Sequence, residues 1–218
     1  MARFGVILSG CGVFDGAEIQ EAVACLLAID RRGDTYACLA PDRELETIDH
    51  LKQTPGGDRR NVLVESARIA RGEITSLAEV DGAQYDAIVL PGGFGAAKNL
   101  CTFAVDGPDC SVDEQVARVL REAHTARRPI GFACIAPAVA AAVFGRDQHP
   151  TLTIGTDEGT AAGLEALGAK HENRDPTGIV IDESNRIVST PCYMSASRVS
   201  EVFAGCDAMV GAMKDMMA

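Results

Sequence analysis

The feature that most constrains the fold of this 218-residue chain is an alternation of short apolar runs with helix-length segments. The apolar runs lie at 4–8, 36–40, 87–90 and 129–133. Runs of this length and composition are typical of strands buried on both faces of a sheet. Between them, apolar residues recur at the helical spacing, as Ile19, Val23 and Leu26 do. Strands that alternate with helices predict β-α-β units and a doubly wound, mostly parallel sheet flanked by helices, of the flavodoxin-like type.

The remaining predicted elements are shorter or less regular. Helices are predicted at 61–70, 112–126, 137–144, 157–167 and 195–216, with a turn of helix at 96–100. Short strands are predicted at 152–154, 179–181 and 187–189, and a loop at 55–58. The first helix is predicted to start at Asp15, with Glu18 completing a capping box. Without a linker or a repeat, the chain is predicted to form a single domain over residues 1–218.

Composition excludes several classes of function. The net charge is −11, tryptophan is absent and aromatic residues make up 5% of the chain, so nucleic acid is not an expected partner. No stretch is long and apolar enough to cross a bilayer, so a membrane is not an expected partner either. The first ten residues are too short for a signal peptide, which leads us to expect a cytoplasmic location.

The chain has eight cysteines, and none of them forms a C-x-x-C pair. This spacing predicts neither a zinc ribbon nor a thioredoxin motif, so no metal site is expected. Several of the cysteines lie within apolar runs, and buried free thiols are the expected state of most of them.

Cys134 occupies the position best suited to chemistry. The buried strand at 129–133 leads directly into Cys134, and a helix follows, which predicts an elbow that presents the thiol at the carboxyl edge of the sheet. The N–H of Ile135 would point toward a developing oxyanion, and the helix N-terminus would favour thiolate. The alternative from these residues alone is that Cys134 is one more small buried hydrophobe, which is the commoner role of cysteine.

Two further segments follow strands of the same predicted sheet. Gly92 and Gly93 end the strand at 87–90, and the N–H of Gly93 would complete an oxyanion pocket; the alternative is a plain strand-to-helix turn. Neither this segment nor the glycines after the first strand have the spacing of a P-loop or a dinucleotide site.

The first helix has an acidic start. Glu18 is explained by the helix dipole, whereas Glu21 is expected to reach the carboxyl edge of the sheet. Cys11 lies in the glycine-rich loop after the first strand and is expected to line the same pocket.

Together these segments resemble the DJ-1/PfpI superfamily, and within it the ElbB subfamily of isoprenoid-biosynthesis proteins with an amidotransferase-like domain, which includes the ES1 proteins. The matching segments are 5–16, 16–21, 90–93, 92–100, 133–137, 153–157 and 190–194. The resemblance runs from Phe4 to about Met209, and it favours the nucleophilic role of Cys134 over the structural one.

The resemblance implies a glyoxalase-type enzyme that converts glyoxal to glycolate without glutathione. Cys134 would form a hemithioacetal with the small dicarbonyl substrate, and Glu21 would move the proton as general acid and base. Gly93 and Ile135 would hold the oxyanion, and neither a metal nor an organic cofactor is expected. The family also leads us to expect a homodimer.

One departure from many relatives is that Ile135, not histidine, follows the cysteine. The four histidines are His50, His124, His149 and His171. None of them lies in an amidotransferase-like motif, which disfavours a Cys-His peptidase or glutaminase unless His149 or His171 approaches Cys134 by folding. We expect His124 on a solvated helix face.

Two alternatives stay open. One is a redox sensor in which Cys134 is oxidised and held by Glu21. The other is a non-catalytic binding module with an indirect effect on isoprenoid metabolism. We expect Cys134 to be the only one of the eight thiols that reacts quickly with limiting iodoacetamide at neutral pH, with Cys11 as the first competitor and Cys192 as the second.

Overall fold

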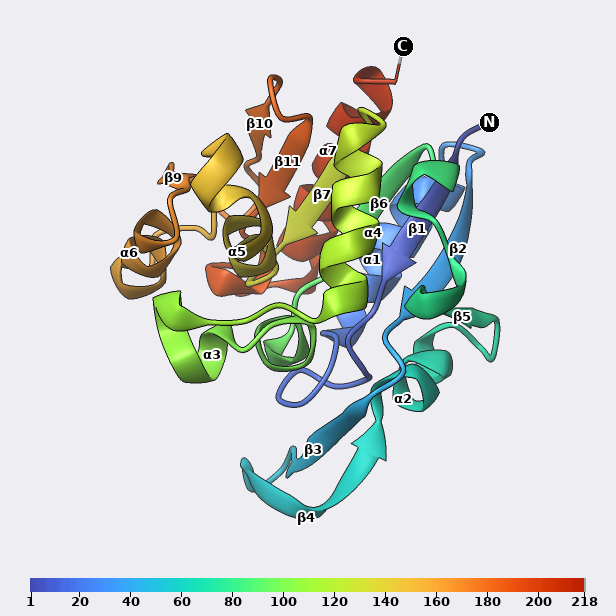
Figure 1. Cartoon of the computed structure of the whole chain (residues 1–218), viewed down its shortest axis with the longest axis vertical. Helices are drawn as coiled ribbons and strands as arrows, with labels where there is room; N and C mark the ends of the chain where they lie inside the picture. The colour runs from blue at the N-terminus through green and yellow to red at the C-terminus, as the bar shows by residue number, and fades with distance from the viewer. Residues whose placement is uncertain (218) are drawn as a thin grey trace.

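The computed structural model describes residues 1–217, and a seven-stranded sheet forms its centre, in the order β10-β11-β7-β6-β1-β2-β5 (Figure 1). The strands are β1 (Arg3–Ile7), β2 (Thr35–Ala40), β5 (Ile74–Ser76), β6 (Ala87–Leu90), β7 (Ile130–Ala133), β10 (Val180–Asp182) and β11 (Ile187–Thr190). All neighbours pair in parallel except β10 and β11, which run antiparallel. The predicted mostly parallel sheet is therefore confirmed.

Helices cover both faces of this sheet, which confirms the doubly wound arrangement (Figure 1). One face carries α1 (Ile19–Asp30) and α7 (Val199–Asp215), which pack on each other. The opposite face carries α4 (Glu114–Thr125) and α5 (Pro137–Gln148). The smaller helices are α2 (Val62–Ile69), α3 (Phe103–Asp106) and α6 (Glu158–Ala166). Each face of the sheet has its own apolar core, because the strands present buried side chains to both layers.

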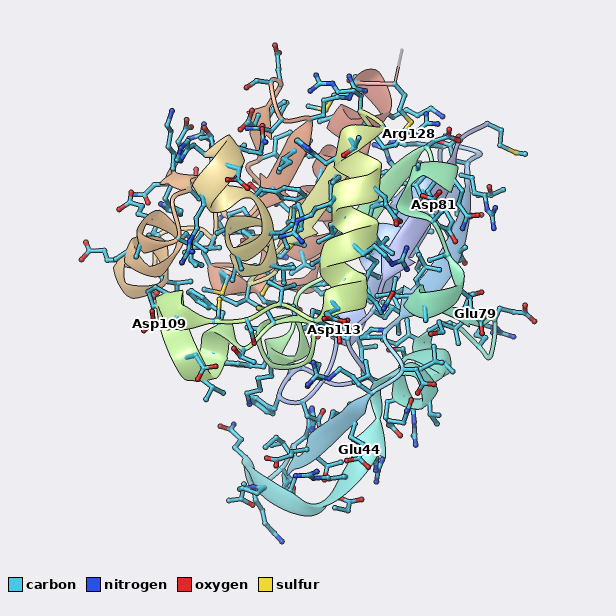
Figure 2. All side chains as sticks on the ribbon, viewed as in Figure 1. Glu44, Glu79, Asp81, Asp109, Asp113 and Arg128 are labelled. Carbon is cyan, nitrogen blue, oxygen red and sulfur yellow. The ribbon has the colours of Figure 1, made fainter. Side chains whose placement is uncertain are left out.

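Short helical turns occupy most of the connections. They are η1 (Leu77–Glu79), η2 (Gly82–Gln84), the π-helical η3 (Ala96–Leu100), η4 (Gly107–Asp109) and η5 (Cys192–Met194). No helix within residues 1–217 has the length and apolarity needed to cross a membrane. Acidic side chains are spread over several elements of the surface, among them Glu44, Glu79, Asp81, Asp109 and Asp113 (Figure 2).

Two small sheets lie outside the central one. The hairpin of β3 (Glu44–Asp49) and β4 (Thr54–Asn61) projects from the body of the molecule (Figure 1). The predicted loop at 55–58 is therefore wrong, because these residues belong to β4. Almost every residue of β4 is exposed, so the strand has no apolar face to reveal it in the sequence. The other small sheet pairs β8 (Thr151–Leu152) with β9 (Lys170–His171).

The first helix begins later than predicted. Its N-cap is Glu18, whose side chain accepts a hydrogen bond from the Glu21 N–H at 2.7 Å. Asp15 instead accepts from the N–H of Ile48 at 2.8 Å and so ties the glycine-rich loop to the β3–β4 hairpin. A capping box starting at Asp15 is therefore wrong: one acidic residue caps the helix and the other holds a tertiary contact.

Candidate active site

Cys134 stands at the turn between β7 and α5 with a left-handed backbone, at φ 59°. A residue other than glycine rarely adopts this conformation, and it persists where the surroundings hold it. Here the Cys134 N–H donates to the Thr190 carbonyl of the neighbouring strand at 2.9 Å, and α5 starts three residues later at Pro137. This turn directs the thiol toward the carboxyl edge of the sheet, where the sequence places it.

Glu21 is fully buried beside Cys134, and hydrogen bonds from three separate segments hold its carboxyl group. One oxygen, Oε2, accepts from the Gly92 N–H at 3.0 Å. The other, Oε1, accepts from the Tyr193 N–H at 3.1 Å. The carboxyl group also forms a hydrogen bond with the thiol of Cys134. Glu21 from α1 and Cys134 from the end of β7 thus meet as one buried pair.

The pKa values of both groups in this pair are raised, whereas a helix N-terminus alone would lower the pKa of the thiol. Burial raises the pKa of the Glu21 carboxyl to about 8, despite the hydrogen bonds from Tyr193, Cys134 and Gly92 that lower it. Burial, and after it the charge of Glu21, raises the pKa of the Cys134 thiol well above its usual value, while the Gly93 N–H lowers it. Helix-dipole effects are worth about 0.3–1 kcal/mol, whereas full burial can shift a pKa by several units, so burial prevails. Both groups are therefore neutral at pH 7, and the predicted lowering of the Cys134 pKa is wrong.

Gly92 and Gly93 allow the loop after β6 to approach this pair. A Cβ atom on Gly92 would lie 2.3 Å from the Cβ of Cys134 and 2.6 Å from Oε2 of Glu21. Gly93 has φ 95°, and a Cβ atom there would lie 2.4 Å from the backbone nitrogen of Glu18. Neither position can hold a side chain without displacing α1 or the elbow.

The sequence predicts two backbone N–H groups as oxyanion donors, those of Gly93 and Ile135. The Gly93 N–H forms a hydrogen bond with Cys134. The Ile135 N–H, next to the elbow, has no acceptor among residues 1–217. The role of these two groups as oxyanion donors, predicted from the sequence, stays a prediction.

Cys11 faces a different space. It is partly exposed and lines a cavity of about 280 Å³ under the β3–β4 hairpin, together with polar residues such as Asp15, His50 and Arg68. Neither Cys134 nor Glu21 lines this cavity. Cys11 therefore lines the cavity under the hairpin, and its place in the pocket of Cys134 stays a prediction.

The two late histidines stay away from the thiol. His149 is the C-cap residue of α5, so this helix of 12 residues, about 18 Å long, lies between His149 and the elbow. Its Nδ1 lies 2.9 Å from the Gly168 carbonyl oxygen. The Nε2 atom of His171 accepts a hydrogen bond from the N–H of Ile154. His124 is half-buried against Phe144, with ring centroids 4.9 Å apart, so the predicted solvated position is wrong. No Cys-His pair forms at Cys134.

Sequence reasoning missed the role of the segment after β11. Tyr193 supplies the backbone N–H that holds Glu21, and the neighbouring Cys192 has φ 45° and is fully buried. The sulfur of Cys192 lies 3.5 Å from that of Cys206 on α7. The available signals were that 190–194 follows a strand and is one of the segments that carry the family resemblance, but neither reveals a contact made by a backbone atom. Residues 1–217 contain no cluster of histidine, cysteine and acidic side chains suited to a metal ion.

The fold and the site define a class of protein: a DJ-1/PfpI-like α/β protein with an elbow cysteine and a buried glutamate from the first helix. A DJ-1 superfamily protein from Salmonella typhimurium shares this fold, with a TM-score of 0.59 and 18% identity over 99% of this chain and 95% of that one. Closer similarity joins the chain to the isoprenoid biosynthesis protein with amidotransferase-like domain from Ehrlichia chaffeensis, at a TM-score of 0.94 and 34% identity over 100% of both chains.

The chain belongs to the ES1 family. It is 47% identical over 220 residues to the rat protein named ES1 protein homolog, mitochondrial, covering 96% of this chain and 82% of that protein. It has the same identity to the human glutamine amidotransferase-like class 1 domain-containing protein 3, mitochondrial, covering 96% of this chain and 81% of that protein. No family model matches the chain.

The comparison corrects the expected cytoplasmic location, because both of these relatives are named as mitochondrial proteins. The expectation rested on the composition of the chain and on its first residues. Targeting segments are separate from the domain that folds, so the folded part of a protein carries little information about its compartment.

Proposed function

We propose that this protein is a glutathione-independent glyoxalase-type enzyme that converts glyoxal and water to glycolate. The observation that carries the proposal is the buried hydrogen-bonded pair of Cys134 and Glu21, in which the pKa of Glu21 is raised to about 8. A group with a pKa near neutrality is suited both to giving and to accepting a proton, which the reaction requires of Glu21 in turn.

The chemistry follows from the groups around the sulfur. The thiol adds to one aldehyde carbon, a C–S bond replaces the C–O π bond, and the thiol proton ends on the new hydroxyl of the hemithioacetal. Glu21 as carboxylate removes the proton from that carbon and, through an enediol, a proton arrives on the neighbouring carbon to give a thioester. Water then cleaves the thioester and releases glycolate and the thiol, while the N–H groups of Gly93 and Ile135 hold the oxygen that becomes negative.

The burial of the pair favours a small substrate. Cys134 is 7% exposed and Glu21 is fully buried, so the site suits a two-carbon dicarbonyl better than a side chain carried on a folded protein. The absence of a Cys-His pair at Cys134 also disfavours peptidase and glutaminase chemistry, in which histidine activates the nucleophile. The redox alternative for Cys134 has less support, because a neutral buried thiol reacts slowly with peroxide.

A direct test is NMR of purified protein with glyoxal, following glycolate. Cys134→Ser should abolish turnover, because the serine hydroxyl has a far higher pKa and no strong base lies beside it. Glu21→Gln should lose about 10²–10⁴-fold in turnover, the usual contribution of a general acid–base step. Far-UV circular dichroism on the same samples checks that both variants are folded.

Glu18→Gln is the matched control on the same helix. The Glu18 side chain caps α1 through the Glu21 N–H, and the amide oxygen of glutamine can accept that bond, so this variant should keep its turnover. Absence of glycolate with the wild-type protein would overturn the proposal. An inactive Glu18→Gln beside an active Glu21→Gln would overturn the role of Glu21.

A further inference from the structure

A second pair of cysteines lies in the loop that joins η3 to α4. Cys101 follows η3 directly and forms an isolated antiparallel bridge with Val112. Beside it, the N–H of Thr102 donates to the Ser111 carbonyl at 2.9 Å, so the chain from 102 to 111 is closed at its base. Cys110 lies just inside this closure, one residue before Ser111.

The bridge sets Cys101 and Cys110 on one face of the loop. Residues two apart along a strand point the same way, so Cys110 shares the side of Val112 and is the diagonal neighbour of Cys101. Both side chains pack against the same apolar core, and each thiol shifts the pKa of the other. The Cys101 thiol donates a hydrogen bond to the carbonyl oxygen of Ala96 at 3.5 Å, which fixes the Cys101 side chain in the loop.

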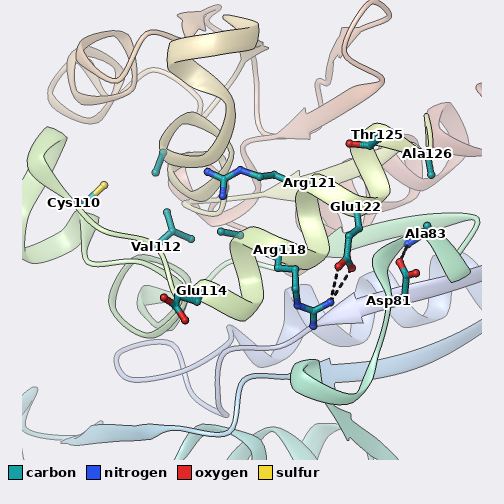
Figure 3. A pocket seen from close by; sticks show the side chains of 12 residues that line it. Asp81, Ala83, Cys110, Val112, Glu114, Arg118, Arg121, Glu122, Thr125 and Ala126 are labelled. Atoms are coloured by element: carbon teal, nitrogen blue, oxygen red, sulfur yellow. Dashed lines mark hydrogen bonds and ion pairs between the residues drawn. The ribbon is translucent and has the colours of Figure 1, made fainter.

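Cys110 is accessible to solvent, whereas Cys101, Cys192 and Cys206 are buried. It is partly exposed and lines a cavity of about 840 Å³ along α4, as well as a neighbouring cavity of about 350 Å³. Arg121 lines both cavities, and its side chain extends from α4 toward the side on which Cys110 lies (Figure 3). Arg118 is engaged by Glu122 at 2.8 Å, whereas Arg121 has no ion-pair partner within residues 1–217.

The thiol of Cys110 also has the electrostatics of a reactive cysteine. The hydrogen bond from Cys101 lowers the pKa of Cys110 to about 7, against the opposing effects of partial burial and of Asp106 and Asp109. The same hydrogen bond and burial raise the pKa of Cys101, so Cys101 remains the proton-bearing partner. Cys110 is therefore more thiolate at neutral pH than an ordinary cysteine, of which only a few per cent is ionised.

We propose that Cys110 and Cys101 form a peroxide-responsive dithiol, with Cys110 as the attacking thiol and Cys101 as the resolving thiol. The Cys110 thiolate attacks one oxygen of a hydroperoxide, the O–O bond breaks, and Cys110 becomes a sulfenic acid while the peroxide is reduced to water or an alcohol. The Cys101 sulfur then attacks the Cys110 sulfur, an S–S bond forms, and the sulfenic hydroxyl leaves as water with the Cys101 proton.

The loop permits the closing step. A disulfide needs Cα atoms within about 4.4–6.8 Å, and diagonal neighbours of an antiparallel pair lie only slightly beyond this range. The residues between the two cysteines include the exposed Ala104, Val105 and Asp106, and Gly107 at φ 55°, so this part of the segment can shift while Phe103 keeps its place against the core. The proposal does not depend on turnover at Cys134.

The first test is labelling of the folded protein with limiting iodoacetamide at pH 7, followed by peptide mapping. Cys110 should be labelled at least about tenfold faster than any other cysteine, with a half-maximal rate near pH 7. Two variants separate the causes: Cys101→Ala removes the hydrogen-bond donor and should slow the labelling about tenfold, whereas Cys101→Ser retains a donor and should slow it less. Labelling of Cys134 or Cys11 before Cys110 would overturn the proposal.

The second test is one equivalent of hydrogen peroxide, blocking of free thiols and mass spectrometry. Trypsin leaves both cysteines in the peptide 99–118, so a further cleavage before Asp106 or Asp109 is needed to reveal two fragments joined by a disulfide. Cys134→Ser should still form this disulfide, and both Cys101 variants should instead accumulate a sulfenic acid that dimedone traps at Cys110.

An internal comparison is provided by Cys192 and Cys206, whose sulfurs are 3.5 Å apart but fully buried. If access and thiolate character decide the reaction, this pair should stay reduced at the dose that joins Cys101 to Cys110. A Cys192–Cys206 disulfide that forms first, or a Cys110 that is oxidised without joining Cys101, would overturn the proposal.

Discussion

Cys134 and Cys110 each lie beside a second titratable side chain, yet the pKa values of their thiols are shifted in opposite directions. Cys134 shares a buried site with a carboxyl group, and burial together with the charge of Glu21 raises its pKa. Cys110 is partly exposed and receives a hydrogen bond from a second thiol, which lowers its pKa. The comparison teaches that an elbow at a helix N-terminus presents a thiol but does not by itself ionise it, because the cost of burying the charge is larger.

The two sites also suggest different ways of working. At Cys134 the proton is shared with Glu21, so reaction requires a bound substrate whose oxygen can take the negative charge while Gly93 and Ile135 stabilise it. At Cys110 the thiolate exists before any reactant arrives, so a small oxidant meets it already ionised. Variants that alter one site and not the other are therefore the clearest way to test this contrast.

Among variants outside the reacting pair of Cys134 and Glu21, the largest expected effect is that of Gly92→Ala. A Cβ atom at 2.3 Å from the Cβ of Cys134 must displace the elbow or α1, and we expect turnover to fall by at least about 10²-fold, with a destabilisation of about 1–3 kcal/mol. Glyoxal turnover and urea unfolding measure the two effects. Labelling of Cys110 should be unchanged, since Gly92 contacts the other site.

Gly159→Ala is the matched control for that substitution. Gly159 lies in α6, and a Cβ atom there meets only Oδ1 of Asp157 at an ordinary 3.7 Å. This variant should keep its turnover and be neutral or more stable by up to about 1 kcal/mol, because alanine favours the helix. Equal losses in Gly92→Ala and Gly159→Ala would show that the elbow has no special need for glycine.

An intermediate effect is expected in the pH dependence of stability. The pKa of Glu21 is raised in the folded state to about 8, so folding retains a proton that the unfolded chain releases above about pH 4.5. The contribution of Glu21 is therefore fully present at acid pH and is lost as pH rises toward 8, by about 4 kcal/mol between pH 5 and pH 9. Urea unfolding across this range should show a steeper decline in the wild type than in Glu21→Gln.

The wild type and Glu21→Gln must be compared by how steeply the free energy of unfolding changes with pH, and not by its absolute value. Both carboxyl oxygens of Glu21 accept a backbone N–H, from Gly92 and Tyr193, and an amide nitrogen cannot replace either acceptor. Glu21→Gln should therefore be less stable at acid pH by about 1–3 kcal/mol. Parallel pH profiles of the two proteins would contradict a neutral Glu21.

The smallest expected effect is on the labelling rate of Cys110 when its neighbour Asp109 is replaced. Asp109 opposes ionisation of Cys110 through its charge, and its side chain is exposed, so solvent and salt screen it. Asp109→Asn should speed iodoacetamide labelling of Cys110 by up to about twofold at low salt and by less at high salt, without changing that of Cys134. Slower labelling would mean that Asp109 acts through the shape of the loop and not through charge.

The local patterns of the sequence were sufficient for the central architecture. The strand at 129–133, the helix after Pro137 and the glycines at 92–93 are adjacent in sequence to the features they position, and the alternation of strands and helices requires parallel crossovers. For this reason the juxtaposition of Cys134, Glu21 and Gly93 at one edge of the sheet was predictable: residues that follow neighbouring parallel strands meet there.

Residues whose roles depend on long-range contacts were not predictable. Tyr193 holds Glu21 through a backbone N–H, which has no signature in the side-chain sequence. The β3–β4 hairpin is almost entirely exposed on β4, so no alternation of apolar and polar residues marks it, and it takes Asp15 away from the helix that it seemed to cap.

The sequence by itself determined the mostly parallel sheet and the position of Cys134 at its carboxyl edge, because hydrophobic periodicity and glycine placement act over short stretches of chain. Only the tertiary structure decided the protonation of each thiol. Burial beneath α1 and α7 and the arrival of Glu21 keep Cys134 neutral, whereas the antiparallel closure at Val112 brings a thiol donor to a partly exposed Cys110. Desolvation and hydrogen bonding depend on groups far apart in the chain, and residue type alone does not specify them.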